Sequence, residues 1–184
     1  MNKHNLRKDL IHKRLLLTDT QCEICAYRAK DSFIPIFQKY NPKIVASYCA
    51  IKNELNPNIC EEYLRKQGVK ILYPRMNNDT KQPLSRLTFH ETEHFETGDY
   101  GILQPVHNSP VYVPDMIICP FVGVDKHKNR LGYGGGFYDM TLANMHTQQI
   151  FPVLVGIGYD FQSISDNFAQ PHDIQFDEVI LINP

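Results

Sequence analysis

The sequence predicts an α/β fold: a three-layer α/β/α sandwich with a largely parallel central sheet, built by residues 1–184 as a single domain. The first observation behind this prediction is the alternation of short apolar runs with helical stretches along the chain. The second is a strand–helix–strand unit with a glycine before its second strand, the pattern of a parallel βαβ crossover. The third is the length of 184 residues, which suits one domain better than two.

The N-terminal third of the chain is predicted to be helical. Apolar residues recur there at helical spacings, and the basic residues lie off that stripe. The apolar stripe comprises Leu6, Leu10, Ile11 and Leu17. A second helix is expected from residue 19 to about residue 37, and Pro35 weakens its end.

The remaining elements follow from apolar, β-prone runs and the helical stretches between them. The βαβ unit consists of a strand at 43–48, a helix at 58–67, Gly68 and a strand at 69–74. Later strands are expected at residues 86–91, 116–124, 151–159 and 178–183, and a later helix at 137–145. In a largely parallel sheet, ligands bind at the carboxyl ends of the strands, so the site is expected there.

Composition argues against several classes of function. The formal net charge is −1, which argues against binding nucleic acid through a basic face but allows a local pocket for a small anion. No apolar run is long enough to cross a bilayer, and the basic N-terminus lacks the apolar block of a secretory signal. A transit peptide is the alternative for that segment, against which Asp9 and the continuing helix argue. We expect a cytoplasmic monomer that binds neither nucleic acid nor membranes.

Cys22 and Cys25 form an isolated CxxC pair among the five cysteines. A structural zinc site usually requires a second pair of cysteines, or paired histidines at a suitable distance, and neither is evident. On the predicted helix the two residues lie one turn apart, where free cysteines pack like small apolar side chains. The pair is therefore interpreted as structural, and reduced thiols agree with a cytosolic protein.

The segment from His90 to His94 spells HExxH, the zinc-protease motif. That chemistry requires both histidines on one face of a helix. The flanking residues are β-prone and lead into a turn, and on a strand the two histidines stand roughly 13 Å apart at about 3.3 Å per residue. One zinc ion cannot bridge that gap, so the motif is interpreted as a chance match.

The most informative segment is the glycine-rich stretch at residues 130–139, which follows an expected strand and precedes an expected helix. Four glycines in the five positions 132–136 let the backbone approach an anion closely, and a helix start presents free N–H groups to it. The stretch lacks GxxxxGK[ST], and Phe137 replaces the third glycine of GxGxxG. Arg130 supplies a forked cation and Asp139 an acid, which together suit a phosphate with a metal ion.

This segment is similar to the signature of the 5-formyltetrahydrofolate cyclo-ligase family, the methenyltetrahydrofolate synthetases. Asp125, followed after four residues by R-L-G-Y-G-G-G-F-Y-D, carries the specific part of the resemblance. Weaker matches keep the family order along nearly the whole chain: residues 3–7, residues 48–54 with Asn56, residues 69–74, residues 101–105, residues 155–162, and His172-Asp173 with Asp177. The resemblance implies the three-layer fold and an enzyme that converts 5-formyltetrahydrofolate and ATP, with Mg²⁺, into 5,10-methenyltetrahydrofolate, ADP and phosphate.

The resemblance also implies a set of site residues. ATP contacts fall on Lys3, His4, Asn5, Leu6 and Arg7, and on Arg130, Leu131, Gly132, Tyr133, Gly134, Gly135, Gly136, Phe137 and Tyr138. Folate contacts fall on Cys49, Glu54, Tyr133, Gly134, Gly135, Gly136 and Phe137, and Mg²⁺ contacts on Asp139 and Asp177. Catalytic roles fall on Arg130, Lys3 and Arg7. From the residues alone, Lys3 and Arg7 share one helical face, which suits either a triphosphate clamp or a solvated basic surface.

Three positions depart from the family pattern. Gln104 stands where glutamate is usual, Gly123-Val124 precede Asp125 where an aromatic residue is common, and Cys49 is small for a folate contact. These departures are expected to affect substrate affinity more than the reaction. Two alternatives stay open: another ATP- or phosphate-using enzyme on the same scaffold, and a non-catalytic nucleotide- or folate-binding protein.

Overall fold

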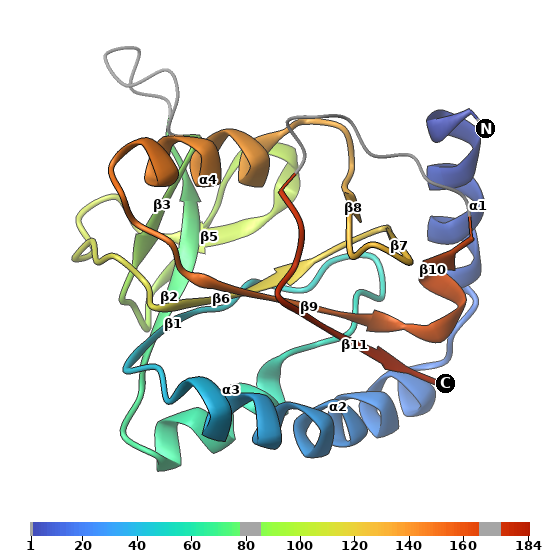
Figure 1. Ribbon diagram of the computed structural model, residues 1–184, viewed down its shortest axis with the longest axis horizontal. Helices are drawn as coiled ribbons and strands as arrows, with labels where there is room; N and C mark the ends of the chain where they lie inside the picture. The colour runs from blue at the N-terminus through green and yellow to red at the C-terminus, as the bar shows by residue number, and fades with distance from the viewer. Residues whose placement is uncertain (1, 78–85, 166–173) are drawn as a thin grey trace.

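The computed structural model describes residues 2–77, 86–165 and 174–184, and its centre is a six-stranded sheet (Figure 1). The strand order is β11-β9-β6-β1-β2-β3, and every neighbouring pair is parallel except β2 with β3. The strands are β1 (Ile44–Ala46), β2 (Lys70–Met76), β3 (Leu87–His90), β6 (Met116–Pro120), β9 (Val153–Tyr159) and β11 (Glu178–Ile182). The predicted, largely parallel sheet is confirmed.

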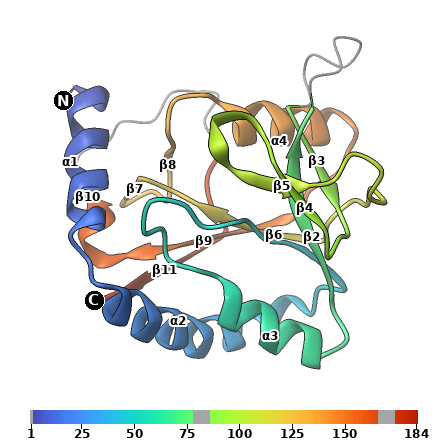
Figure 2. The same ribbon diagram turned by 180° about the vertical axis from the view of Figure 1, so that it is seen from behind.

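Helices cover both faces of this sheet, which confirms the three-layer architecture. Figure 1 shows α2 (Asp19–Tyr40) and α3 (Asn58–Lys66) on one face and α4 (Phe137–Thr147) on the other. The parallel strands β1 and β2 are connected through α3, as expected for the βαβ unit. Helix α1 (Lys3–Leu15) stands beside the small strand β10 (Ser163–Ile164) in both views (Figure 2). Within the described ranges, no helix combines the length and apolar character needed to span a membrane.

Helix α2 is longer than predicted because tertiary packing outweighs its internal proline. Thr18 and Gln21 form a reciprocal capping box at its start, which satisfies free N–H groups there. Pro35 lies inside the helix, on its exposed side, and removes one backbone hydrogen bond. Phe33 and Phe37 on the opposite side are buried in the core, so the helix continues to Tyr40.

The prediction of one strand at 116–124 is wrong, because this segment forms two strands that belong to different sheets. Strand β6 ends at Pro120, and β7 (Gly123–Asp125) belongs to a three-stranded sheet with β8 (Arg130–Leu131) and β10. A Cβ on Gly123 would lie 2.4 Å from Cδ1 of Ile164, so a larger residue at this position would force the Ile164 side chain to move. The division places β8 and the glycine loop beyond the end of the main sheet.

A short hairpin that the sequence did not predict joins β4 (Phe95–Thr97) to β5 (Leu103–Pro105). All three residues of β4 are exposed, so the segment lacks the alternation of apolar and polar residues that indicates a strand. A single 3-10 turn at Asp99–Gly101 connects the two strands, with Tyr100 at φ 60 and Gly101 at φ 71. The hairpin brings new residues to the site described below.

The CxxC pair and the HExxH segment occupy the positions expected of structural residues. Cys22 and Cys25 lie one turn apart on α2, and Cys25 is fully buried. Burial raises the pKa of the Cys25 thiol, as expected for an unreactive core cysteine. His90 ends β3, whereas His94 lies exposed in the loop before β4, so the helix that HExxH chemistry requires is absent from this segment.

A small apolar cluster fixes α1 against the strands that carry the glycine loop. Leu10 of α1 packs there with Val122, Leu131 and Ile164, and all four side chains are buried. Helix α1 contributes few other buried side chains, so this contact decides where its polar face points. Its N-terminal turns therefore lie next to the loop that follows β8.

Candidate active site

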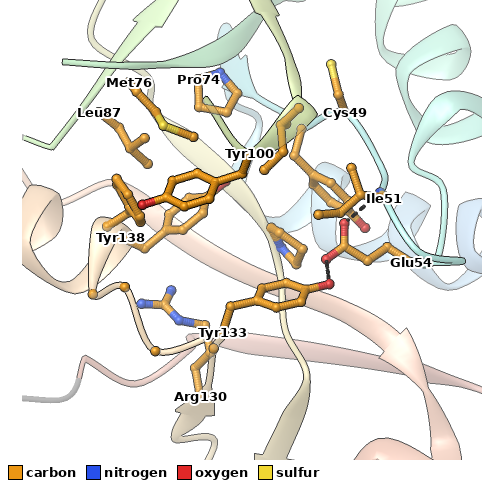
Figure 3. A pocket seen from close by; sticks show the side chains of 18 of the residues that line it. Cys49, Ile51, Glu54, Pro74, Met76, Leu87, Tyr100, Arg130, Tyr133 and Tyr138 are labelled. Carbon is orange, nitrogen blue, oxygen red and sulfur yellow. Dashed lines mark hydrogen bonds between the residues drawn. The ribbon is translucent and has the colours of Figure 1, made fainter. Parts of the chain in front are cut away.

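A cavity of about 630 Å³ opens at the carboxyl ends of β1, β2 and β6, where the parallel-sheet rule places a ligand site (Figure 3). This volume lies within the range of ligand pockets, roughly 300–1,000 Å³. Seven of the described segments converge on it: α1, the loop after β1, the end of β2, the start of β3, the β4–β5 hairpin, the end of β6, and the stretch from β8 through the glycine loop to the start of α4. The cavity has a cationic end, a buried acidic end and an apolar wall.

The glycine loop forms one side of the cavity. Residues 132–136 are half-exposed or exposed, and Gly134 and Gly136 have φ values of 104 and 65, which L-residues adopt only under strain. Gly136 is the N-cap of α4, and glycine has no side chain with which to cap the helix start. The first N–H groups of α4 are therefore available to an anion, and the helix dipole favours one there.

Lys3 and Arg7 of α1 line the cavity together, as their spacing on one helical face predicts. The guanidinium of Arg7 donates from Nε to the carbonyl oxygen of Gly132 at 2.7 Å. A Cβ on Gly134 would lie 3.7 Å from Cζ of Arg7, so this cation is seated against the loop. Both side chains are half-buried in the cavity lining, which favours a phosphate clamp over a solvated basic surface.

Arg130 is buried at the base of the glycine loop. Its Nη2 pairs with Oδ1 of Asp139 at 2.5 Å, and its Cζ lies 5.2 Å from the centroid of the Tyr138 ring. Its Nη1 is buried and has no hydrogen-bond partner among the described residues. A buried donor without a partner is costly and rare, and a site that awaits an anion explains one. Arg130 therefore offers a second contact point for a phosphate.

Glu54 marks the opposite, acidic end of the cavity. Although it lines the cavity, its side chain is buried, and Tyr133 of the glycine loop donates a hydrogen bond of 2.8 Å to its Oε1 (Figure 3). The backbone N–H of Ile51 donates to Oε2 of Glu54 at 3.0 Å, and Nη1 of Arg14 lies 3.8 Å from Oε1. Burial raises the pKa of Glu54, while Arg14, Ile51 and Tyr133 oppose that rise. Such a carboxylate suits a ligand that presents N–H donors.

An apolar wall connects the two ends. Figure 3 shows Pro74, Met76 and Leu87 along it, with Tyr100 of the hairpin in front. The hairpin also contributes Ile102, Leu103 and Gln104. The sequence predicted none of them as site residues, and singled out Gln104 only as a departure from the family pattern. Isolated apolar residues next to a short, exposed strand give no local signal of a binding role. The wall suits the flat face of an aromatic ligand.

Cys49 lies in the cavity lining as expected, next to this wall. Burial raises the pKa of its thiol to about 11, so it is present as a neutral thiol at physiological pH. A neutral, small side chain contributes space and apolar surface to the cavity and no charge.

The structure brings some of the predicted residues to the cavity and leaves others away from it. Those that line it are Lys3, Arg7, Cys49, Glu54, Arg130, Leu131, Gly132, Tyr133, Gly134, Gly135, Gly136, Phe137, Tyr138 and Asp139. His4 and Asn5 lie on the exposed side of α1, and Leu6 packs against the apolar cluster around Leu10. The segment His172-Asp173 lies outside the described residues.

Asp177 is not part of the cavity lining. It lies exposed just before β11, where its Oδ2 accepts a hydrogen bond of 2.7 Å from the backbone N–H of Leu154, near the start of β9. The starts of parallel strands lie at the edge of a sheet opposite their carboxyl ends. The structure therefore gives Asp177 a contact that joins β9 and β11, and its metal role stays a prediction.

The residues of the cavity fit a metal ion that arrives with a phosphate ligand. Asp139 lines the glycine-loop end, and one of its oxygens is paired with Arg130. Within residues 2–77, 86–165 and 174–184, no group of three or more His, Cys, Asp and Glu side chains is placed to hold a metal. Mg²⁺ often binds through one or two carboxylates, substrate phosphates and waters, so Asp139 fits that mode and an all-protein site does not.

The chain is similar to known proteins along nearly its whole length. The model of the 5-formyltetrahydrofolate cyclo-ligase family matches residues 1–182. The chain is 29% identical over 184 residues to the 5-formyltetrahydrofolate cyclo-ligase of Mycoplasma pneumoniae, with 98% of each chain covered. It is 25% identical over 183 residues to that of Haemophilus influenzae, with 97% of each covered.

Solved structures extend the likeness to three dimensions. The 5,10-methenyltetrahydrofolate synthetase of Mycoplasma pneumoniae matches with a TM-score of 0.77 and 26% identity, over 98% of both chains. The NMR structure of the Aquifex aeolicus 5,10-methenyltetrahydrofolate synthetase matches with a TM-score of 0.78 and 24% identity, over 97% of this chain and 89% of that one, and supports the fold alone.

Proposed function

The chain belongs to the 5-formyltetrahydrofolate cyclo-ligase family of enzymes, and we propose that it uses ATP to close 5-formyltetrahydrofolate into 5,10-methenyltetrahydrofolate, releasing ADP and phosphate. The observation that supports this most directly is the pairing, within one cavity, of a cationic end and a buried carboxylate. Two substrates of different chemistry can then meet between those ends. The proposal includes a cytoplasmic monomer, as the sequence predicts.

The cationic end is proposed to bind the phosphates of ATP. The uncapped start of α4 and the loop around Gly134 offer backbone donors. Lys3 and Arg7 add charge from α1, and Nη1 of Arg130 offers a buried donor that has no hydrogen-bond partner among the described residues. This distribution suits a polyphosphate, because separate cations face the same loop from two elements.

The acidic end is proposed to bind the pterin ring of the folate. The amino and N–H groups of the pterin ring are hydrogen-bond donors. The carboxylate of Glu54 is an acceptor that Ile51 and Tyr133 already hold in place. Cys49 and the apolar wall offer space and flat surface for the ring, and Phe137 continues that surface toward the glycine loop. The formyl group would then lie between the two ends.

The reaction follows from the weakness of a formamide as an electrophile. The formyl oxygen attacks the γ-phosphorus of ATP, the bond from that phosphorus to the β-bridging oxygen breaks, and ADP leaves. The resulting iminium phosphate is attacked at the formyl carbon by N10 of the folate. The C–O bond then breaks toward phosphate, N10 loses its proton, and the five-membered ring is closed.

The protein's contribution is positioning and charge stabilisation. We assign the holding of the phosphates to Arg7 and the amides near Gly134, and the stabilisation of charge on the transferring group to Arg130. Asp139 is the proposed carboxylate ligand of Mg²⁺. When bound, Mg²⁺ neutralises charge on the phosphate oxygens during transfer.

An absorbance assay tests the proposal. Purified protein with 5-formyltetrahydrofolate and Mg-ATP should form the absorbing methenyl product, with one ADP released for each ring closed. Substitution of ADP for ATP is the control and should give no product. ADP release with other acceptors but not with this folate would favour a different ATP-using enzyme on this scaffold, and ligand binding without ADP release would favour a binding protein.

A further inference from the structure

We propose that Arg14 is a positioning residue for the folate end of the cavity, where it holds the Tyr133 hydroxyl and the Glu54 carboxylate in one fixed arrangement. Arg14 itself does not line the cavity, so it acts through the residues that do. The inference rests on the proposed function, because it assigns a role in folate binding. It adds a residue that no sequence motif indicated.

The contacts of Arg14 form a directed chain. Its guanidinium donates from Nη2 to the hydroxyl of Tyr133, and that hydroxyl donates at 2.8 Å to Oε1 of Glu54. A phenol has one proton to donate, so accepting from Arg14 leaves that proton for Glu54. Because Oε2 accepts from the N–H of Ile51, both carboxylate oxygens are oriented before any ligand arrives. The remaining lone pairs are then available to a ligand.

Arg14 is also the cation that compensates the buried charge of Glu54. The charged group that faces Glu54 from α1 is Arg14, Lys52 faces it from its own loop, and Tyr133 faces it from the glycine loop. The buried phenols of Tyr48 and Tyr138 also feel its charge. Burial raises the pKa of Glu54, and Arg14 is the first of the groups that oppose this rise. Loss of Arg14 would therefore favour the protonated acid, which is the weaker acceptor.

Helix α1 connects this arrangement to the phosphate end. Arg7 and Arg14 are two turns apart on one continuous helix, a rise of roughly 10 Å at 1.5 Å per residue. Arg7 contacts the loop at Gly132, and Arg14 contacts the next residue of that loop, Tyr133. One helix thus holds the glycine loop at two points, on the nucleotide side and on the folate side.

A purely structural role for Arg14 is the competing explanation. Its Nε donates to the carbonyl of Lys52 at 2.9 Å, and its Nη1 lies 3.5 Å from the carbonyl of Phe121. These bonds stabilise two loops whatever the state of Glu54. If the role of Arg14 is purely structural, its replacement should lower thermal stability and weaken the binding of both substrates to a similar degree. If Arg14 is a positioning residue, its replacement should change folate binding and the pH dependence of that binding, and only while Glu54 carries its charge.

The test is a double-mutant cycle with Arg14→Met, Glu54→Gln and the double variant. Binding of 5-formyltetrahydrofolate is measured by calorimetry without ATP, and kcat and KM for each substrate by absorbance, across a pH series. Arg14→Lys restores the charge without the fork, and Arg28→Met is the matched control. Arg28 donates to the carbonyl of Asn183, and neither of these residues lines the cavity.

In the wild-type background, Arg14→Met should weaken folate binding on the order of tenfold, with the folate KM rising more than the ATP KM. The loss should grow as the pH falls, and Arg14→Lys should restore part of the affinity. In the Glu54→Gln background the same change should cost clearly less, while the drop in Tm persists. Arg28→Met should leave all these quantities near wild type.

Equal weakening by Arg14→Met in both backgrounds, or equal rises in the two KM values, would overturn the inference in favour of a structural role. Folate binding by Arg14→Met that matches wild type would overturn it as well. Failure of wild-type protein to form the methenyl product is a different result, because it removes the proposed function itself. The cycle thus separates the two failures.

Discussion

Arg130 and Asp139 form an ion pair of 2.5 Å at the base of the glycine loop, while Nη1 of the same arginine stays buried without a partner in the described structure. The pair lies at the start of α4, whose N-terminus has no capping side chain. A phosphate bound there would satisfy both the unpaired nitrogen and the helix start. This relationship is the basis of the first two predictions.

Replacing Arg130 by methionine should raise the KM for ATP by about tenfold or more, because a charge-assisted contact is lost and Asp139 loses its partner. Steady-state kinetics with varied ATP at saturating folate measure this. Lys39→Met is the control, since it breaks an ion pair with Glu178, neither residue lines the cavity, and KM should not change. An ATP KM equal to that of wild type in the Arg130 variant would place the phosphates elsewhere.

Replacing Asp139 by asparagine should lower kcat by about 100-fold or more while the protein stays folded, because a carboxylate near the transferring group is lost. A Mg²⁺ titration of turnover and a melting curve measure the two effects. Asp177→Asn is the informative comparison. A shifted Mg²⁺ requirement in that variant would support the metal role that the family resemblance implies, and an unchanged one would leave its contact with Leu154 as its function.

Replacing Gly134 by alanine should destabilise the protein by about 1–3 kcal/mol, because its φ of 104 lies outside the regions that alanine occupies. The added methyl has room, with the closest atom of Arg7 at 3.7 Å, so the cost comes from the backbone. Gly132→Ala is the matched control, since nothing lies within 4 Å of its Cβ position and its φ is not positive. Melting temperatures compare the two, and an equal loss in both would contradict this explanation.

Folate turnover should fall on the acid side at a pH above the ordinary pKa of glutamate. Burial raises the folded-state pKa of Glu54 above 4.5, so the folded protein holds this proton more tightly than the unfolded chain does. Stability from this group is therefore greatest below 4.5 and declines as the pH rises through the folded pKa. Folate binding has the opposite sign, because it requires the carboxylate.

The measurement is kcat/KM for 5-formyltetrahydrofolate at saturating ATP across a pH series, which reports ionisations of the form that binds folate. The Glu54→Gln variant should have a lower maximum kcat/KM and should lack the decrease at low pH that protonation of Glu54 causes. Ionisations of ATP affect both proteins equally, so they do not account for a difference between the two profiles. Profiles of the same shape in the two proteins would remove Glu54 from folate binding.

Much of the fold could be predicted because its signals are local. The run before Gly68 is helical and the runs around it are β-prone, so the βαβ unit followed from neighbouring residues. Errors arose where distant packing decides. Helix α2 continues to Tyr40, past the expected end near residue 37, because Phe33 and Phe37 are buried on the side opposite Pro35. Strand 116–124 divided after Pro120, because β7 pairs with strands beyond the main sheet.

The sequence by itself determined the glycine loop, the helix that follows it and the two cations one turn apart on α1, because each depends on residues close together in the chain. Only the tertiary structure decided that Tyr133 meets Glu54, 79 positions away, and Arg14, 119 positions away. It also decided that Asp177 lies away from the cavity. Strand order and crossovers set such distances, and no local pattern of residue types encodes them.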